Sequence, residues 1–87
     1  MASYSLLIKR SAAKELEAVE PRSLRARLVS RIQGLASYPR PAGSQKLAGN
    51  DERFRIRQGA YRIVYSVDDS ACVVEVVRIG HRGDVYR

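Results

Sequence analysis

The sequence predicts an α+β fold in which a helical hairpin packs on one face of a small, mostly antiparallel sheet. Apolar residues recur at helical spacing in the first half of the chain and alternate with polar residues in the second half. A segment rich in Pro, Gly, Ser and Asn, residues 40–52, separates the two patterns and is expected to be irregular. With 87 residues and no linker or repeat, the chain has room for a single domain, residues 1–87.

The first half of the chain is expected to form a short strand followed by two helices. Residues 3–9 have strand character, and Ser11 is a favourable N-cap for a first helix over residues 12–19. Pro21 suits the first position of a second helix, because its missing N–H would be unpaired there in any case. The apolar stripe of this second helix consists of Leu24, Leu28, Ile32 and Leu35.

Three consecutive strands are predicted in the second half, over residues 54–58, 61–68 and 71–79. Gly59-Ala60 suits a two-residue turn between the first two strands, and Asp69-Ser70 is a similar connection between the last two. Cys72 alternates with the core face of the last strand and is expected to be a small buried apolar residue.

The first of these turns also determines which side chains share a face of the sheet. It pairs Arg57 with Arg62 and places Arg55 on the same face, opposite the apolar residues that the helices are expected to cover. Like charges directly across a sheet are destabilising, so a sheet selected only to fold would avoid this arrangement. Three converging guanidinium groups indicate a phosphate-binding face. The plain alternative is a solvated face with Glu75 as its counterion.

The overall charge points to a polyanionic or acidic partner. The chain has 16 basic and 9 acidic residues, a formal net charge of +7, and 13 of the basic residues are Arg. Arginine binds phosphate through a planar fork of donors. Four arginines, Arg22, Arg25, Arg27 and Arg31, spread around the second helix, which makes a recognition helix a weak interpretation.

Several other classes are excluded by the sequence. No apolar run is long enough to span a membrane, and the first residues do not have the form of a secretory signal. A single cysteine and a single histidine leave no cysteine-rich or histidine-rich metal cluster. We therefore expect a cytoplasmic protein that binds neither a metal nor another cofactor.

The C-terminal residues add a different chemistry to this basic surface. His81 is the one side chain whose ordinary pKa, about 6.5, suits proton transfer near neutral pH. Arg82 is placed to stabilise an anionic transition state, and Tyr86 to stack on a base or to hold a proton. The plain alternative for His81 is an exposed residue in a loop after the last strand.

The order of the elements and four segments together resemble the RelE-type toxins of bacterial toxin–antitoxin systems. The segments are Lys46-Leu47-Ala48-Gly49, Phe54-Arg55-Ile56-Arg57, Tyr61-Arg62-Ile63-Val64-Tyr65 and Gly80-His81-Arg82-Gly83-Asp84-Val85-Tyr86-Arg87. The resemblance implies a ribosome-dependent endoribonuclease that cuts mRNA without a metal. In this reaction the ribose 2′-OH attacks the adjacent phosphate and leaves a 2′,3′-cyclic phosphate.

The resemblance also implies roles for individual residues. Arg62 and Arg82 match arginines that grip the scissile phosphate, and Tyr86 matches the tyrosine that stacks on and orients the nucleotide. RNA-binding roles are expected for Lys46, Arg55, Arg57 and Arg78, and Arg55 and Arg57 fall where some members carry lysines. Because arginine stays protonated and cannot act as a base, we expect His81 to be the acid–base group, with Tyr86 as the alternative.

Two other functions and one partner complete the expectations. The same fold serves ParE-type toxins, which inhibit DNA gyrase without nuclease chemistry, and a non-enzymatic nucleic-acid-binding domain is a third interpretation. The resemblance implies a cognate antitoxin whose C-terminal segment wraps the toxin and whose N-terminal part binds operator DNA. The expected partners are thus the antitoxin, the ribosome and mRNA, with operator DNA contacted only through the antitoxin complex and no membrane.

Overall fold

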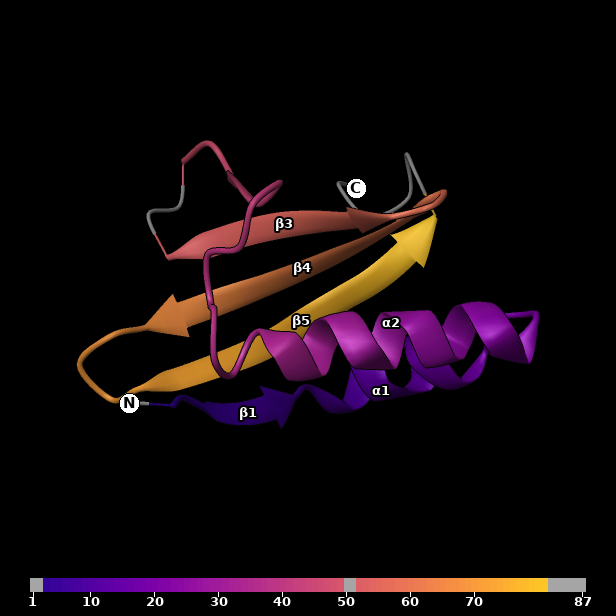
Figure 1. Cartoon of the computed structure of the whole chain (residues 1–87), viewed down its shortest axis with the longest axis horizontal. Helices are drawn as coiled ribbons and strands as arrows, with labels where there is room; N and C mark the ends of the chain where they lie inside the picture. Colours follow the sequence, from indigo (N-terminus) through magenta and orange to yellow (C-terminus); the bar gives the residue numbers. More distant parts are fainter. Residues whose placement is uncertain (1–2, 50–51, 82–87) are drawn as a thin grey trace.

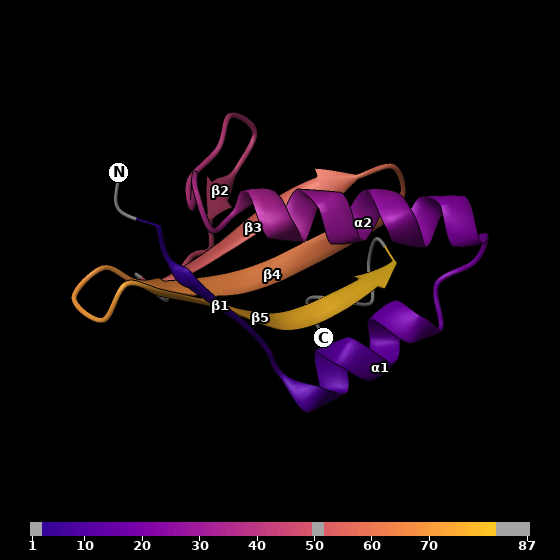
Figure 2. The same ribbon diagram turned by 60° about the horizontal axis from the view of Figure 1, so that its bottom comes forward.

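Two helices pack on one face of a five-stranded sheet in the computed structural model, which describes residues 3–49 and 52–81 (Figures 1 and 2). In chain order the elements are β1 (Ser5–Ile8), α1 (Arg10–Glu17), α2 (Arg22–Gly34), β2 (Gln45–Lys46), β3 (Arg53–Gln58), β4 (Tyr61–Asp68) and β5 (Val73–His81). The predicted α+β class and order of elements are confirmed. The short strand β2 is an addition, because it lies inside the segment that was expected to be irregular.

The strands lie in the order β1-β5-β4-β3-β2. β1 runs parallel to β5, whereas every other neighbouring pair is antiparallel. The predicted three-stranded meander therefore forms the centre of the sheet, and the first strand closes its β5 edge. On the opposite edge β2 covers only Arg55 and Phe54 of β3, so the stretch of β3 near Arg57 has no strand beside it on that side.

α1 begins at Arg10, two residues earlier than predicted, and Ser11 lies inside the helix rather than at its N-cap. The strand before the helix explains the difference. The N–H of Lys9 donates to the carbonyl of Val76 in the sheet, while the carbonyl of Lys9 already accepts the N–H of Ala13. The chain thus passes from sheet to helix at a single residue, and the helix starts without a side-chain cap.

α2 supplies most of the helical side of the core. Pro21 is its N-cap rather than its first helical residue, and the predicted apolar stripe faces the sheet. Leu28 and Ile32 are fully or almost fully buried and share one core cluster with Ile56 and Ile63 of the strands. Within the described ranges, neither helix is long and apolar enough to cross a membrane.

Tyr65 anchors the segment that follows α2 to the sheet. Its ring is fully buried, and its hydroxyl donates to the carbonyl of Pro39 at 2.7 Å. Burial raises the pKa of Tyr65 above the ordinary tyrosine value, so the hydroxyl keeps its proton. Arg40 adds a second tie, because its two terminal nitrogens bind the carboxylate of Asp69 at 2.7 and 3.2 Å. These contacts hold the segment that carries Gly43 against the sheet.

We expect Tyr65→Phe to lower the free energy of unfolding by about 1–2 kcal/mol, because the carbonyl of Pro39 loses its donor while the ring packing stays. Urea unfolding followed by circular dichroism measures the change. Tyr38→Phe is the matched control, because Tyr38 is 67% exposed and its hydroxyl should contribute less than about 0.5 kcal/mol. Equal effects of the two substitutions would show that the bond to Pro39 does not stabilise the fold.

The hairpin between β3 and β4 has the predicted turn and register. Gly59 has φ +60°, a backbone conformation that glycine adopts without strain, and Gln58 pairs with Tyr61 on either side of the two-residue turn. The pairs that follow are those the sequence predicts, including Arg57 with Arg62.

The connection between β4 and β5 is longer than the predicted two residues. Asp68 pairs with Val73, so four residues form the turn, and β5 begins two residues later than expected. The carboxylate of Asp68 accepts the N–H of Ala71 at 3.0 Å, which stabilises the longer turn. Cys72 consequently lies in the turn, half-buried and with φ +56°, and the prediction that it is a buried strand residue is wrong.

A β-bulge interrupts the pairing of β4 with β5. Tyr65 pairs with Val76 but its neighbour Val64 pairs with Arg78, so Val77 is an extra residue in β5. Because side chains alternate between the faces of a sheet, each β5 residue after the bulge faces the side opposite to the one that strict alternation would give.

Candidate nucleic-acid interface

Four arginines of the three central strands lie on the sheet face away from the helices. They are Arg55, Arg57, Arg62 and Arg78, and we call them the arginine face. Arg57 lies directly across from Arg62, and Val64 of β4 lies between Arg55 and Arg78. The predicted convergence of Arg55, Arg57 and Arg62 on one face is confirmed.

Two of these arginines are held against the sheet rather than extended into solvent. Arg55 and Arg62 are each only 7% exposed, whereas Arg57 is exposed. Removing a charged group from water is unfavourable unless an opposite charge or hydrogen bonds compensate. Arg55 and Arg62 form no ion pair with any of residues 3–49 and 52–81. The low exposure of Arg55 and Arg62 distinguishes this surface from one whose arginines all extend into solvent.

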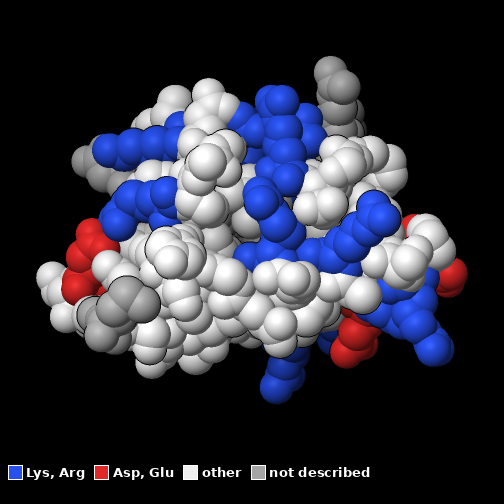
Figure 3. All heavy atoms as spheres, in the orientation of Figure 1, with Lys and Arg blue, Asp and Glu red and all other residues white. Residues whose placement is uncertain are grey.

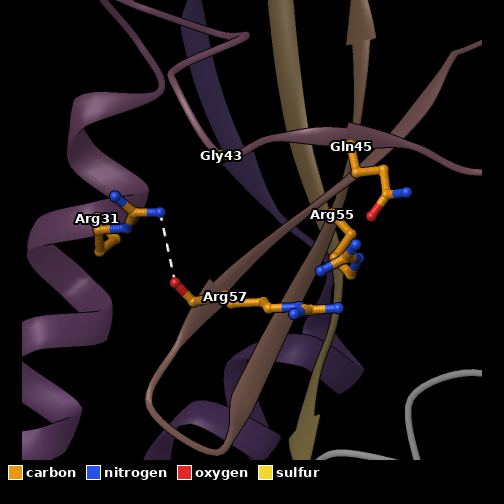
Figure 4. A pocket seen from close by; sticks show the side chains of 5 residues that line it. All are labelled: Arg31, Gly43, Gln45, Arg55 and Arg57. Atoms are coloured by element: carbon orange, nitrogen blue, oxygen red, sulfur yellow. Dashed lines mark hydrogen bonds between the residues drawn. The ribbon is translucent and has the colours of Figure 1, made fainter.

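Two adjoining hollows open beside the arginines. The face hollow, of about 370 Å³, is lined by Gln45, Lys46, Leu47, Ala48, Arg55, Arg57 and Arg62. The edge hollow, of about 350 Å³, is lined by Arg31, Gly43, Gln45, Arg55 and Arg57 (Figure 4). In the surface view, Lys and Arg side chains cross the middle and upper part of the molecule and also protrude at its lower edge, while acidic side chains are seen at its two ends and at the lower edge (Figure 3). Four predicted site residues, Lys46, Arg55, Arg57 and Arg62, thus meet around the face hollow.

A small apolar cluster forms part of the same surface. Val64 and Val77 are almost fully buried on the arginine side of the sheet, and Leu47 packs against them. Because Leu47 also lines the face hollow, the segment after β2 is held in place beside the arginines by apolar contact.

Arg78 is oriented by the first helix. Its Nε lies 3.2 Å from Oε2 of Glu15, and the other carboxylate oxygen of Glu15 accepts the backbone N–H of Ile79 at 2.9 Å. The carboxylate of Glu15 therefore forms an ion pair with Arg78 and also accepts a backbone N–H of β5 at a position beyond the end of β1, where β5 has no strand beside it on that side. Arg78 belongs to the arginine face, but it does not line either hollow.

His81 does not join the arginine face. It pairs with Tyr61 at the end of β5, and the centroids of the two rings are 4.8 Å apart. Tyr61 packs against the core under the helices, so the imidazole lies on the helix side of the sheet, while Gly80 is the residue across from Arg62. The expectation that His81 lies next to the arginines is wrong. The bulge at Val77 is the physical reason, because it exchanges the faces of the last β5 residues.

Of the remaining residues at issue, two were predicted as site residues and one was not. Arg82 and Tyr86 lie outside the described residues. The sequence predicts that Arg31 is one of several arginines spread around the second helix, yet it lines the edge hollow. Its spacing gave a usable signal, because it follows Leu24 by seven residues and Leu28 by three, which places it on the buried face of the helix. Within the described part of the chain, no three His, Cys, Asp or Glu side chains come together as a metal site would need.

Comparisons with known proteins identify relatives over nearly the whole chain. Residues 6–86 match the family described as the ParE toxin of type II toxin-antitoxin system, parDE. Toxin RelG of Mycobacterium tuberculosis is 32% identical over 87 residues, which cover 97% of each chain.

Solved structures show the same fold. A chain of the archaeal RelE–RelB complex from Pyrococcus horikoshii matches with a TM-score of 0.82 and 26% identity, over 95% of this chain and 99% of that one. The isolated E. coli RelE toxin matches with a TM-score of 0.80 and 28% identity, over 92% of this chain and 85% of that one. Sequence and fold thus agree: the chain belongs to the RelE/ParE superfamily of type II toxin–antitoxin toxins, and it is a RelE-type toxin.

Proposed function

We propose that the protein is a ribosome-dependent endoribonuclease that cleaves mRNA and thereby inhibits translation. The observation that carries the proposal is the arginine face, where two largely buried arginine residues and one exposed arginine line a single hollow. Such an arrangement suits the phosphate of an RNA backbone, whose charge grows more negative as a fifth oxygen bonds to phosphorus in the transition state.

The chemistry begins with attack of the ribose 2′-oxygen on the adjacent phosphorus. The new O–P bond forms as the bond to the 5′-oxygen breaks, which leaves a 2′,3′-cyclic phosphate and a free 5′-OH. Arg62, directly across from Arg57, is positioned to bind the non-bridging oxygens with its planar fork. Neither arginine can take the proton of the 2′-OH, because a guanidinium stays protonated. The arginine face supplies binding and charge stabilisation, and another group must transfer the protons.

His81 and Tyr86 are the two candidates for proton transfer, and the position of His81 favours Tyr86. Because the imidazole faces Tyr61 on the other side of the sheet, we expect His81→Ala to slow cleavage by less than about tenfold, below the 10²–10⁴-fold that a general acid or base contributes. Tyr86→Phe, which keeps the ring and removes the proton, should slow cleavage by roughly 10²-fold. Single-turnover cleavage on programmed ribosomes measures both rates. The reverse order of the two effects would return the acid–base role to His81.

A direct assay tests the proposed reaction. Purified chain is mixed with ribosomes carrying a defined mRNA, and cleavage is mapped by primer extension with analysis of the new 3′ end. We expect a cut only when ribosomes are present and a 2′,3′-cyclic phosphate at the product end. An intact mRNA under these conditions would overturn the proposal.

Inhibition of DNA gyrase is a second candidate function. It is favoured by the match of residues 6–86 to a family described by its ParE toxin. A gyrase supercoiling assay with the same protein preparation separates the two functions: the nuclease predicts undisturbed supercoiling together with mRNA cleavage, and the gyrase inhibitor predicts the opposite pair of results.

We also propose that the protein is neutralised by a cognate antitoxin. Relatives were solved as toxin–antitoxin complexes, including the RelE–RelB complex of Pyrococcus horikoshii and the RelBE complex of E. coli. A net charge of +7 favours an acidic segment that covers the arginine face. The complex, rather than the free toxin, should bind operator DNA through the antitoxin. Expression of the toxin alone should arrest growth, and co-expression of an adjacent acidic open reading frame should relieve the arrest.

A further inference from the structure

The edge hollow has a composition that differs from an ordinary surface groove. It lies along β3 near Arg57, where β2 no longer pairs with the strand. Its lining consists of three arginines, one glutamine and one glycine, with no apolar side chain. Figure 4 shows Arg31 reaching from α2 toward β3, with the side chains of Arg55 and Arg57 extending from the strand. In Figure 4 the side chains of Arg55 and Arg57 extend away from Arg31, so positive charge from two separate elements lines the hollow on different sides.

Arg31 is held in place but retains most of its donors. One terminal nitrogen donates to the carbonyl of Arg57 over 3.4 Å, a long and weak hydrogen bond. Its Nε is buried and has no acceptor among the described residues. A guanidinium has five N–H donors; one donates to Arg57 and the one on Nε is buried, which leaves those on the terminal nitrogens for a ligand. The buried Nε has almost no accessible surface, so the terminal nitrogens are the donors that an anion in the hollow would meet.

The lining distinguishes between two kinds of anionic partner. A protein segment usually anchors itself through an aromatic or aliphatic side chain in an apolar pocket, and no aliphatic or aromatic side chain lines the edge hollow. Planar guanidinium forks match the oxygens of a phosphate. Glycine at position 43 contributes backbone to the wall without a side chain that would fill the space. A phosphate of a nucleic acid is therefore the occupant that this chemistry favours.

The two hollows are continuous through the residues they share, which are Gln45, Arg55 and Arg57. We propose that the edge hollow binds a second backbone phosphate of the same RNA strand, next to the one in the face hollow, and that Arg31 is its specific ligand. The inference rests on the proposed function, because it places the scissile phosphate at Arg62. The proposed site adds a residue from α2 to the RNA-binding surface. An RNA that occupied both hollows would bend around the β3 edge of the sheet.

Binding of a short single-stranded RNA to the full chain without ribosomes tests the site, with a 2′-O-methyl group at each sugar to prevent cleavage. We expect Arg31→Gln to weaken binding about tenfold and to reduce the slope of log K against log salt by about 0.7, the value for one lost phosphate contact in a single strand. Arg22→Gln is the matched control. Arg22 is an exposed residue at the start of the same helix, nine residues or about 13 Å along its axis from Arg31, and its loss should leave the slope unchanged.

A chemically altered RNA separates a phosphate contact from a purely structural role of Arg31. Single phosphates of the RNA are replaced in turn by neutral methylphosphonates. At one linkage the wild type and Arg31→Gln should bind the altered RNA equally, because the neutral group has already removed the phosphate that Arg31 contacts. The site would be overturned if Arg31→Gln and Arg22→Gln had the same RNA affinity and the same salt slope. It would also be overturned if Arg31→Gln lost affinity for an acidic antitoxin peptide but bound RNA as well as wild type.

The test also distinguishes this site from the proposed function. Ribosome-dependent cleavage that is unaffected by Arg31→Gln, with unchanged RNA binding, would remove the second phosphate site and leave the nuclease. RNA binding that depends on Arg31 in a chain that cuts no mRNA would support the site and remove the nuclease. Thermal unfolding of both variants confirms that each is folded.

Discussion

Replacing Arg62 by alanine should reduce ribosome-dependent mRNA cleavage by roughly 10²–10³-fold, the loss typical of removing one preorganised donor to a developing negative charge. Arg62 is the appropriate position because it is nearly buried, lines the face hollow and lies directly across from Arg57. A side chain that is already largely buried has less freedom to lose when it binds the developing charge. Single-turnover cleavage rates on saturating ribosomes measure the effect on the chemical step.

Two controls show whether the loss belongs to the phosphate contact. Arg62→Lys keeps the charge but not the fork, and we expect a rate between those of wild type and Arg62→Ala. Arg27→Ala removes an exposed arginine of α2 and should change the rate by less than about threefold. The fold itself should tolerate Arg62→Ala, because the substitution also removes the like-charge pair with Arg57. A wild-type rate for Arg62→Ala would remove the arginine face from the reaction.

Leu28→Ala should lower the free energy of unfolding by about 3–5 kcal/mol, the cost of deleting a buried leucine side chain and leaving a cavity. Leu28 is 0% exposed at the centre of α2, where it belongs to the cluster that joins the helix to the strands. A domain of this length has a total stability of only about 4–13 kcal/mol. The substitution should therefore remove a large share of the stability, which urea unfolding would show as a lower midpoint.

Leu24→Ala is the control for this effect. It deletes the same atoms one turn earlier in α2, but Leu24 is only partly buried against the core. Its cost should be less than half that of Leu28→Ala, because less apolar surface is exposed and the site can relax. Similar losses for the two leucines would contradict the packing of α2 on the sheet.

The β3–β4 hairpin was predictable because its signals are local. Gly59 supplies the positive φ that the turn needs, the two strands alternate strictly, and together these fix which residues face the helices. The same local rule placed Arg55, Arg57 and Arg62 on one face. The part of the site on these two strands could therefore be predicted from the sequence alone.

The end of β5 could not be predicted, since it depends on one inserted residue. Every residue from Val73 to Ile79 is compatible with a continuous strand, and nothing in the sequence marks Val77 as the bulge. The insertion turns Arg78 toward the arginines and His81 toward Tyr61. A shift of one residue in the pairing of β5 with β4 thus places His81 on the opposite face of the sheet from the one that the sequence predicts.

Two other features depend on contacts between distant segments. The two-residue strand β2 is too short for an alternating pattern, and it forms only because β3 offers a partner. Arg31 acquires its place from the packing of α2 against the sheet, which sets its guanidinium beside the carbonyl of Arg57. β2 has no local sequence signal, and the helical spacing of Arg31 indicates the buried face of α2 without indicating a binding site.

The open edge of β3 has a consequence for concentrated protein. Unpaired backbone at the border of a sheet attracts a matching strand from another molecule, which is how many β-proteins begin to aggregate. Here the backbone carbonyl of Arg57 is occupied by Arg31, and the side chains at this border carry positive charge. Two copies that approached each other border to border would bring like charges together, so the positive charge at this border should disfavour self-association of the toxin.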